Sequence, residues 1–122
     1  MINLSEKRQD NIIAGTREKK VLVFGDLMAD EYLWGKVSRI SPEAPVPIIN
    51  ISNAQVRFGG AANVAFNLVG LEQTPILVGL IGNDRMGEQF REMLDDNKLP
   101  SDGILTVDER PTTVKTRIMA RH

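Results

Sequence analysis

Two short, unbroken hydrophobic runs mark the chain most clearly. Val21-Leu22-Val23-Phe24 stops at Gly25-Asp26, and Ile76-Leu77-Val78-Gly79-Leu80-Ile81 stops at Gly82-Asn83. Unbroken apolar runs of this length, closed by turn residues, are typical of strands that are buried on both faces of a parallel sheet. We therefore predict two such core strands, followed by a shorter third strand at residues 104–107.

Helical patterns follow each glycine-containing turn. Residues 61–71 are apolar nearly all round and begin directly after Gly59-Gly60, which predicts a buried helix. Further on, apolar residues recur at helical spacing, at Met86, Phe90, Met93 and Leu94. This spacing predicts an amphipathic helix that begins at Asp84, a residue type that caps helix N-termini.

A third kind of pattern occupies residues 31–58 and 113–121. The run 45–51 is rich in β-branched residues and begins with two prolines, which confine it to a sheet edge or to a separate small sheet. From Thr113 the chain alternates, with one side made of Val114, Thr116 and Ile118 and the other of Lys115, Arg117, Met119 and Arg121. The first of these segments predicts a lid-like insertion between the first core strand and the helix that follows it, and the second predicts a strand with two different faces.

The order of these elements predicts an α/β fold with a mainly parallel sheet. We divide the chain into an extension with a surface helix after Ser5 (1–19) and the N-terminal part of a domain (20–122). The alternating run still has its β pattern at His122, so we expect only a portion of a larger domain. Such a portion would leave apolar faces for the missing part or for a partner.

Composition excludes several functions. Fifteen Lys and Arg against sixteen Asp and Glu leave a net charge of −1, which disfavours nucleic-acid binding. The chain has no cysteine, and its one histidine is the last residue, so thiolate metal sites and a Ser-His-Asp triad are excluded. No apolar span is long enough to cross a membrane and no signal peptide is evident, so we expect a cytoplasmic protein.

The turn at Gly59-Gly60 is the strongest candidate site. Two glycines let a ligand approach the backbone, and Asn63 in the first turn of the following helix can donate and accept hydrogen bonds. A polyhydroxylated ligand or an anion would suit this corner, and a simple tight turn before a helix is the alternative. The spacing is neither that of a dinucleotide fingerprint nor that of a P-loop.

Charged side chains supply two further candidates. Asp26 and Asp30 follow the first core strand, where open α/β sheets collect ligands, although both could be ordinary turn or solvated residues. Lys115 and Arg117 share one side of the alternating run, a spacing suited to a phosphate group or merely to solubility. Arg39 precedes a loop with three prolines and is equally ambiguous.

Longer stretches resemble a known family. The run GGAANVAFNLVGLEQTPILVGLIG resembles the first signature of the ribokinase-like (PfkB) carbohydrate kinases. Together with FGDLMADEYLWGKVSRISPEAPVPIINI, it is similar to the N-terminal part of the heptose-7-phosphate kinase domain of bacterial bifunctional ADP-heptose synthases. The resemblance covers residues 20–121 and departs at Glu72, where the family signature usually has Gly or Ser, so the turn there is in question.

The resemblance implies a ribokinase-like three-layer sandwich with a small β lid, made here of residues 31–58 and 113–121. It implies transfer of the ATP γ-phosphate, with Mg²⁺, to a hydroxyl of a sugar phosphate for ADP-heptose and lipopolysaccharide core synthesis. Family contacts to the sugar map onto Asp30, Gly59, Gly60 and Asn63. We assign Arg39, Lys115 and Arg117 to the sugar phosphate because of their charge and lid position.

One family motif is missing from this sequence. The G-A-G-D-type motif that supplies the catalytic base does not occur, so we expect the base and the ATP site to lie beyond the chain end and these 122 residues to be inactive alone. The alternative is a non-catalytic sugar-binding or dimerisation module. In either case, we expect the lid to form a homo-oligomer, since exposed strand edges and apolar faces recruit partners.

Overall fold

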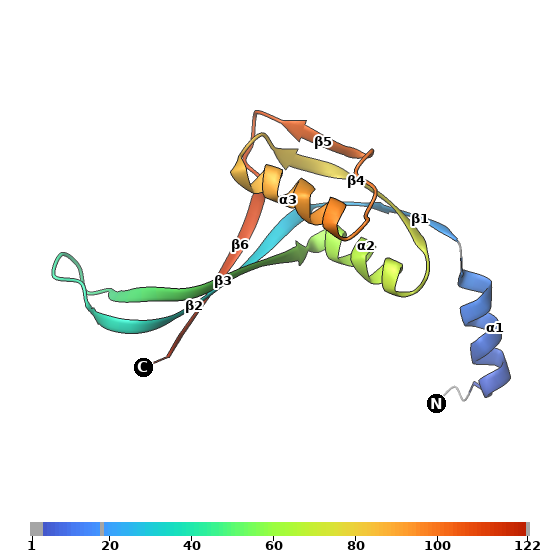
Figure 1. Ribbon diagram of the computed structural model, residues 1–122, viewed down its shortest axis with the longest axis horizontal. Helices are drawn as coiled ribbons and strands as arrows, with labels where there is room; N and C mark the ends of the chain where they lie inside the picture. The colour runs from blue at the N-terminus through green and yellow to red at the C-terminus, as the bar shows by residue number, and fades with distance from the viewer. Residues whose placement is uncertain (1–3, 18, 122) are drawn as a thin grey trace.

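The computed structural model describes residues 4–17 and 19–121 of the chain. Figure 1 shows an α/β body, a long lid that extends away from it, and an N-terminal helix that stands to one side. The six strands of the described residues form two three-stranded sheets, one in the body and one in the lid. Body and lid meet where the first core strand passes directly into the lid.

The body sheet is wholly parallel, with the strand order β1-β4-β5. Its strands are β1 (Lys20–Phe24), β4 (Thr74–Gly82) and β5 (Ile104–Val107). Helices α2 (Gly60–Gly70) and α3 (Arg85–Asp96) lie against one face of this sheet, as Figure 1 shows. The predicted parallel strands and the positions of the two predicted helices are therefore confirmed. The expectation that α2 is buried is wrong, because only Ala62 and Ala65 of this helix are buried and several of its other apolar side chains, among them Phe66, are exposed.

Alternate residues of the body strands form the core with the two helices. Phe90 of α3 is fully buried and meets Phe58 edge to face, with ring centroids 5.5 Å apart. The other buried apolar residues of this cluster include Val23, Leu77, Ile81, Ala62, Ala65, Leu94 and Ile104. Aromatic pairs in this geometry add stability beyond their buried area.

The opposite face of the body sheet is bare in the described part of the chain. Its apolar side chains are Leu22, Phe24, Ile76, Leu80 and Leu105, and Phe24 is 80% exposed. The prediction that these strands are buried on both faces is therefore wrong for this chain. The reason is that both packed helices, α2 and α3, cover the same face.

The lid is a separate sheet of three long strands in the order β3-β2-β6. Strands β2 (Leu27–Ile40) and β3 (Pro47–Gly59) are antiparallel, and β6 (Thr113–Arg121) runs parallel to β2. The prediction that the proline-led segment forms an edge strand of a small sheet is confirmed. That strand continues to Gly59, well beyond the predicted 45–51, because pairing with β2 extends over its polar residues.

Helix α1 (Glu6–Thr16) begins after Ser5, as predicted, and none of its residues is buried. No helix in the described ranges, 4–17 and 19–121, has the length and apolar character needed to cross a membrane.

The turn after α2 contains Glu72, the position at which the sequence departs from the family signature. Glu72 has a φ of 59°, a conformation that favours glycine. Its N–H donates to the Val69 carbonyl at 3.0 Å, and the Gln73 N–H donates to the Leu68 carbonyl at 3.0 Å. These two bonds form a Schellman motif, so the turn closes even though a side chain occupies its glycine position.

Candidate functional site

Strand β3 passes into helix α2 through Gly59 and Gly60 without an intervening loop. A Cβ on Gly59 would lie 2.8 Å from the Met28 Cγ and 3.0 Å from the Asp30 Cγ. Gly60 has a φ of +54°, and a Cβ there would collide with the Asp26 carbonyl oxygen. Both glycines therefore let the first residues of β2 lie against the start of α2.

The structure places Asp30 inside β2, not in the turn after β1 as the sequence had suggested. The turn is limited to Gly25 and Asp26, because Leu27 and Ala29 are buried in the core and keep the chain extended from Leu27 onward. Asp30 thus belongs to the lid. Its carboxylate points from the body end of the lid sheet toward the glycine pair.

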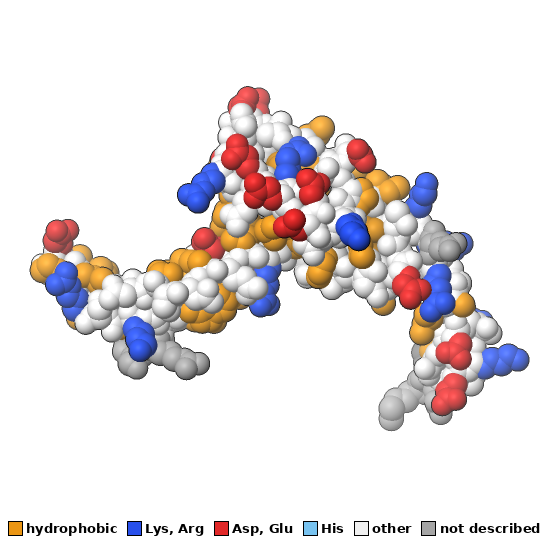
Figure 2. Space-filling view, viewed as in Figure 1, with side chains coloured by type: hydrophobic (Ala, Val, Ile, Leu, Met, Phe, Trp, Pro, Cys, Tyr) orange, Lys and Arg blue, Asp and Glu red, His pale blue; other side chains and the backbone are white. Residues whose placement is uncertain are grey.

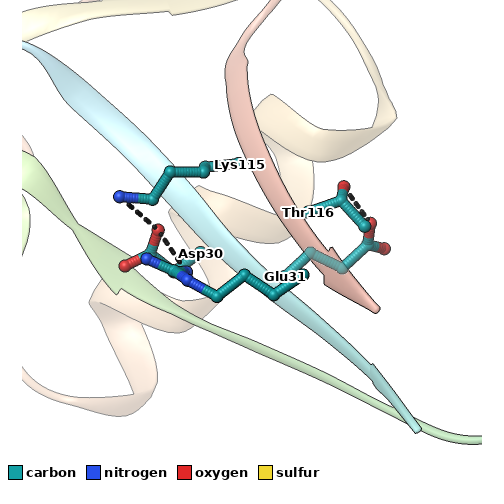
Figure 3. A network of polar contacts seen from close by, with 5 residues as sticks. Asp30, Glu31, Lys115 and Thr116 are labelled. Atoms are coloured by element: carbon teal, nitrogen blue, oxygen red, sulfur yellow. Dashed lines mark hydrogen bonds and ion pairs between the residues drawn. The ribbon is translucent and has the colours of Figure 1, made fainter. Parts of the chain in front are cut away.

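Two cations of β6 hold the Asp30 carboxylate. Its Oδ1 atom lies 3.1 Å from Arg117 Nη1 and 3.6 Å from Lys115 Nζ. The side chain of Asp30 is 18% exposed, whereas that of Lys115 is 55% exposed. Figure 3 shows this group on one face of the lid and the Thr116–Glu31 hydrogen bond, 2.7 Å long, on the other. The predicted alternation of β6 is confirmed.

An open cleft of about 560 Å³ lies between the lid and the helices. The lid contributes Asp30, Tyr32, Gln55 and Arg57 to its lining, and the helices contribute Asn63, Asn67 and Asn97. Carboxylate, amide and guanidinium groups in a concave site suit a small polar ligand with several hydroxyl groups. This cleft is the candidate functional site.

The structure brings most of the predicted site residues together. Asp30 and Asn63 line the same cleft, Gly59 and Gly60 join the two elements that carry them, and Lys115 and Arg117 bind Asp30. Arg39 does not join them. It lies nine residues beyond Asp30 on β2, about 30 Å away at roughly 3.3 Å per residue, and it pairs with Ile48 near the tip of the lid.

Sequence reasoning missed the aromatic and basic residues beside Asp30. The guanidinium carbons of Arg57 and Arg117 lie 5.3 Å and 5.0 Å from the centre of the Tyr32 ring. Tyr32 also stacks on Trp34, with ring centroids 5.9 Å apart. The period-two alternation of β3 before the glycine pair could have placed Arg57 on the face of Asp30, its cross-strand partner.

A buried polar cluster fixes where β6 begins. Asp84 caps α3 by accepting a 2.7 Å hydrogen bond from the Gly87 N–H, and its other oxygen accepts one of 2.7 Å from the Thr112 N–H. The Thr112 hydroxyl donates to Asp84 at 2.8 Å. These bonds, first of all that from the Thr112 backbone, lower the pKa of Asp84 below its usual 3.8. The strand that carries Lys115 is thereby held to the body.

The described residues do not fit a metal site. Across residues 4–17 and 19–121, no group of three or more His, Cys, Asp or Glu side chains is placed so that it could hold an ion. The sequence also lacks a P-loop. We therefore assign neither ATP nor Mg²⁺ to the described residues of this chain.

Comparison with known proteins decides the family. The model of the pfkB family carbohydrate kinases matches residues 18–122. The chain belongs to this family. Kinases of the family are transferases that use ATP and Mg²⁺, and the α/β body with its mainly parallel sheet is the ribokinase-like fold that the sequence predicted.

Curated relatives carry the same segment at one end of a longer chain. The chain is 49% identical over 104 residues to a bifunctional protein HldE of Helicobacter pylori, covering 85% of this chain and 22% of that protein. It is 42% identical over 109 residues to a bifunctional protein HldE of Wolinella succinogenes, covering 89% of this chain and 23% of that protein. The chain thus spans about a fifth of the length of the curated relatives it matches.

Solved structures agree with this assignment. A ribokinase of Cryptococcus neoformans in complex with ADP is 25% identical, with a TM-score of 0.62, over 84% of this chain and 31% of that one. A carbohydrate kinase of Agrobacterium tumefaciens is 26% identical, with a TM-score of 0.64, over 84% and 32%. The PfkB carbohydrate kinase fold is therefore shown by sequence and by structure.

Proposed function

We propose that this chain is the sugar-binding and lid part of an ATP-dependent kinase that phosphorylates a heptose 7-phosphate. The product would serve ADP-heptose and lipopolysaccharide core synthesis. Family membership and the resemblance to heptose-7-phosphate kinase domains support the proposal. The single observation that carries it is that Asp30 from the lid and Asn63 from α2 line one cleft.

Asp30 and Asn63 would bind hydroxyl groups of the sugar. The Asp30 carboxylate accepts hydrogen bonds, and its contacts with Lys115 and Arg117 keep it in one position. The Asn63 amide can both donate and accept, and it stands on the first turn of a packed helix. The absence of a Cβ at Gly59 lets the Asp30 side chain lie against the start of α2, and its absence at Gly60 lets the Asp26 carbonyl approach there. Lys115 and Arg117 supply positive charge beside the site for the phosphate of the substrate.

Binding of the sugar phosphate tests this proposal directly. Calorimetric titration of the full-length protein with heptose 7-phosphate should show binding that Asn63→Ala weakens by about 10- to 100-fold, the cost of leaving a buried hydroxyl unpaired. Asn53→Ala is the matched control, because Asn53 is an exposed lid asparagine paired with Trp34. Equal affinity for the two variants would contradict the proposed site.

Turnover distinguishes a kinase part from a non-catalytic module. We expect no sugar-dependent ATP turnover from the 122 residues alone, because phosphoryl transfer needs a positioned base and nucleotide contacts that this chain does not supply. A coupled ADP-release assay with heptose 7-phosphate measures it. Turnover above the blank that Asp30→Ala abolishes would show that this chain is catalytically sufficient. Absent turnover in the full-length protein as well would favour a binding module.

The lid is also the surface through which we propose that two copies associate. It carries exposed apolar residues, among them Val46 just before β3, Ile51 on β3 and Ile118 on β6, and Figure 2 shows hydrophobic side chains along the lid. Unpaired strand edges with such residues recruit a second strand or sheet. Light scattering at tens of micromolar should show self-association that Ile118→Asp weakens, and a clean monomer would contradict it.

A further inference from the structure

One face of the lid carries more positive than negative charge. On the strand segments around Asp30, the described residues of this face include Lys115, Arg117 and Arg57, with Asp30 as the one carboxylate among them. The neighbouring carboxylate, Glu31, lies on the opposite face and accepts from Thr116. Like charges held this close favour the binding of an anion, which lowers their mutual repulsion.

Arg57 differs from the other two cations in its partners. Asp30 contacts Lys115 and Arg117, whereas no ion pair with Arg57 occurs within residues 4–17 and 19–121. The Arg57 Nη2 atom donates instead to the neutral Gln55 Oε1 at 2.9 Å. A guanidinium has five N–H donors, so most of those on Arg57 remain available.

Its surroundings also hold Arg57 in place at the cleft. The guanidinium lies over the Tyr32 ring, and Arg117 approaches the same ring from the neighbouring strand β6. Stacking on an aromatic ring occupies the face of a guanidinium and leaves its in-plane donors free to bind a planar or tetrahedral oxyanion. Arg57, Gln55 and Tyr32 all line the cleft that Asn63 enters from the helix side.

We infer that Arg57 is the principal ligand of the substrate's own phosphate, with Arg117 of strand β6 assisting it beside Tyr32. This inference rests on the proposed function. The hydroxyl-binding pair, Asp30 and Asn63, and the phosphate-binding Arg57 would then hold opposite ends of one molecule. This separation excludes the tip residue Arg39 from the site within one copy of the chain. It also makes the enzyme prefer a phosphorylated sugar over the free sugar.

The test compares two ligands on four proteins. Calorimetry of the full-length protein measures the affinities for heptose 7-phosphate and for the unphosphorylated heptose. Arg57→Gln should weaken binding of the phosphorylated sugar by about 10- to 100-fold, the usual effect of losing charge-assisted hydrogen bonds, and leave the free sugar unchanged. Arg57→Lys keeps the positive charge but loses the paired N–H donors of the guanidinium. Its affinity for the phosphorylated sugar should lie between those of the unaltered protein and Arg57→Gln. Arg39→Gln, the matched lid control, should bind both sugars as the unaltered protein does.

Three results would overturn the inference. If Arg57→Gln weakens both sugars equally, Arg57 acts on the site as a whole and not on the phosphate. If Arg57→Gln loses no more affinity than Arg39→Gln, the phosphate lies elsewhere, while the proposed function stands as long as Asn63→Ala still weakens binding. If the unaltered protein binds neither sugar, the proposed function fails, and the inference fails with it. Arg57→Lys decides the question where Arg57→Gln does not fold.

Discussion

The body and the lid are built on opposite principles. Body residues such as Phe90 and Leu77 are buried and touch mostly other apolar side chains. Around the cleft, lid residues such as Asp30 and Arg57 contact polar or aromatic partners and keep open space on one side. Different interactions therefore stabilise the two parts. Burial of apolar area stabilises the body, whereas electrostatic and hydrogen-bond partners set the arrangement of the lid.

The sharpest test of this contrast is a pair of large-to-small substitutions. Phe90→Ala in the body should lower the free energy of unfolding by about 3–5 kcal/mol, because it leaves a cavity in a packed core. Ile118→Ala in the lid, where the side chain is 56% exposed, should cost less than about 1 kcal/mol. Urea titrations of both variants measure the two losses in the free energy of unfolding. Similar losses would mean that the lid has a core of its own.

Ligand affinity should reverse the order of importance. Asp30→Asn and Asn63→Ala should each weaken sugar-phosphate binding by about 1–3 kcal/mol. The first replaces a charged acceptor of a buried hydroxyl with a neutral amide, and the second removes a hydrogen-bonding partner altogether. Lys115→Ala should cost about 1 kcal/mol or less, since its half-exposed ammonium acts partly through water. Calorimetry on variants whose unfolding midpoints are intact gives the ranking. If Lys115→Ala weakens binding the most, the cations of β6 dominate binding, and Asp30 and Asn63 do not.

Stability should depend on pH through Asp84, which links the start of α3 in the body to Thr112 before the lid strand β6. Because hydrogen bonds lower the pKa of folded Asp84, its contribution to stability is fully present above the unfolded value of 3.8 and is lost as pH falls through the folded value. The stability difference between the unaltered protein and Asp84→Asn should therefore be constant from neutral pH down to about 4 and shrink below it. Urea midpoints across this range measure the difference. If the stability difference between the two proteins grows as pH falls, the pKa of folded Asp84 is raised and not lowered.

The smallest expected effect is a gain. Glu72→Gly should stabilise the body by about 1 kcal/mol, because glycine adopts the left-handed conformation there without steric cost. The substitution also removes the exposed Arg17–Glu72 ion pair, which contributes little. Lys98→Gly, at the equivalent left-handed position after α3, provides a second case. Thermal melts of the two variants should both shift upward, and destabilisation of both would contradict the assignment.

How far the sequence predicted the molecule also differs between the two regions. The body strands followed from unbroken apolar runs and α3 from apolar residues at helical spacing, because residues such as Leu77 and Phe90 pack together in the core. Helix α2 followed from an apolar stretch directly after two glycines. The patterns of β1 and β4 did not predict the bare second face, since Leu22 and Phe24 have the same pattern whether or not anything covers them. Exposed apolar faces followed only from the expectation that the chain is a portion of a larger domain. Coverage is a tertiary property that a single strand does not encode.

The site was only half predictable for a related reason. Gly59, Gly60 and Asn63 are adjacent in sequence, so the corner they form could be recognised locally. Arg57 and Tyr32 meet only through the register of β2 and β3, which is set by pairing along the full length of both strands. Arg39 was assigned by its charge and its place in the lid, and the same register carries it to the far end of the lid, away from Asp30.

The lid hairpin also bears on the order in which the chain can fold. β1 pairs with β4, yet β2, β3 and α2 all lie between them in sequence. β2 and β3 are joined by a short turn that the Ser41 N–H closes onto the Val46 carbonyl at 2.8 Å, so they can pair before any distant contact exists. Each halving of the remaining loop lowers the entropic cost of joining β1 to β4 by about 0.6 kcal/mol. We expect substitutions along the hairpin to slow refolding, measured by stopped-flow fluorescence of Trp34, more than they speed unfolding.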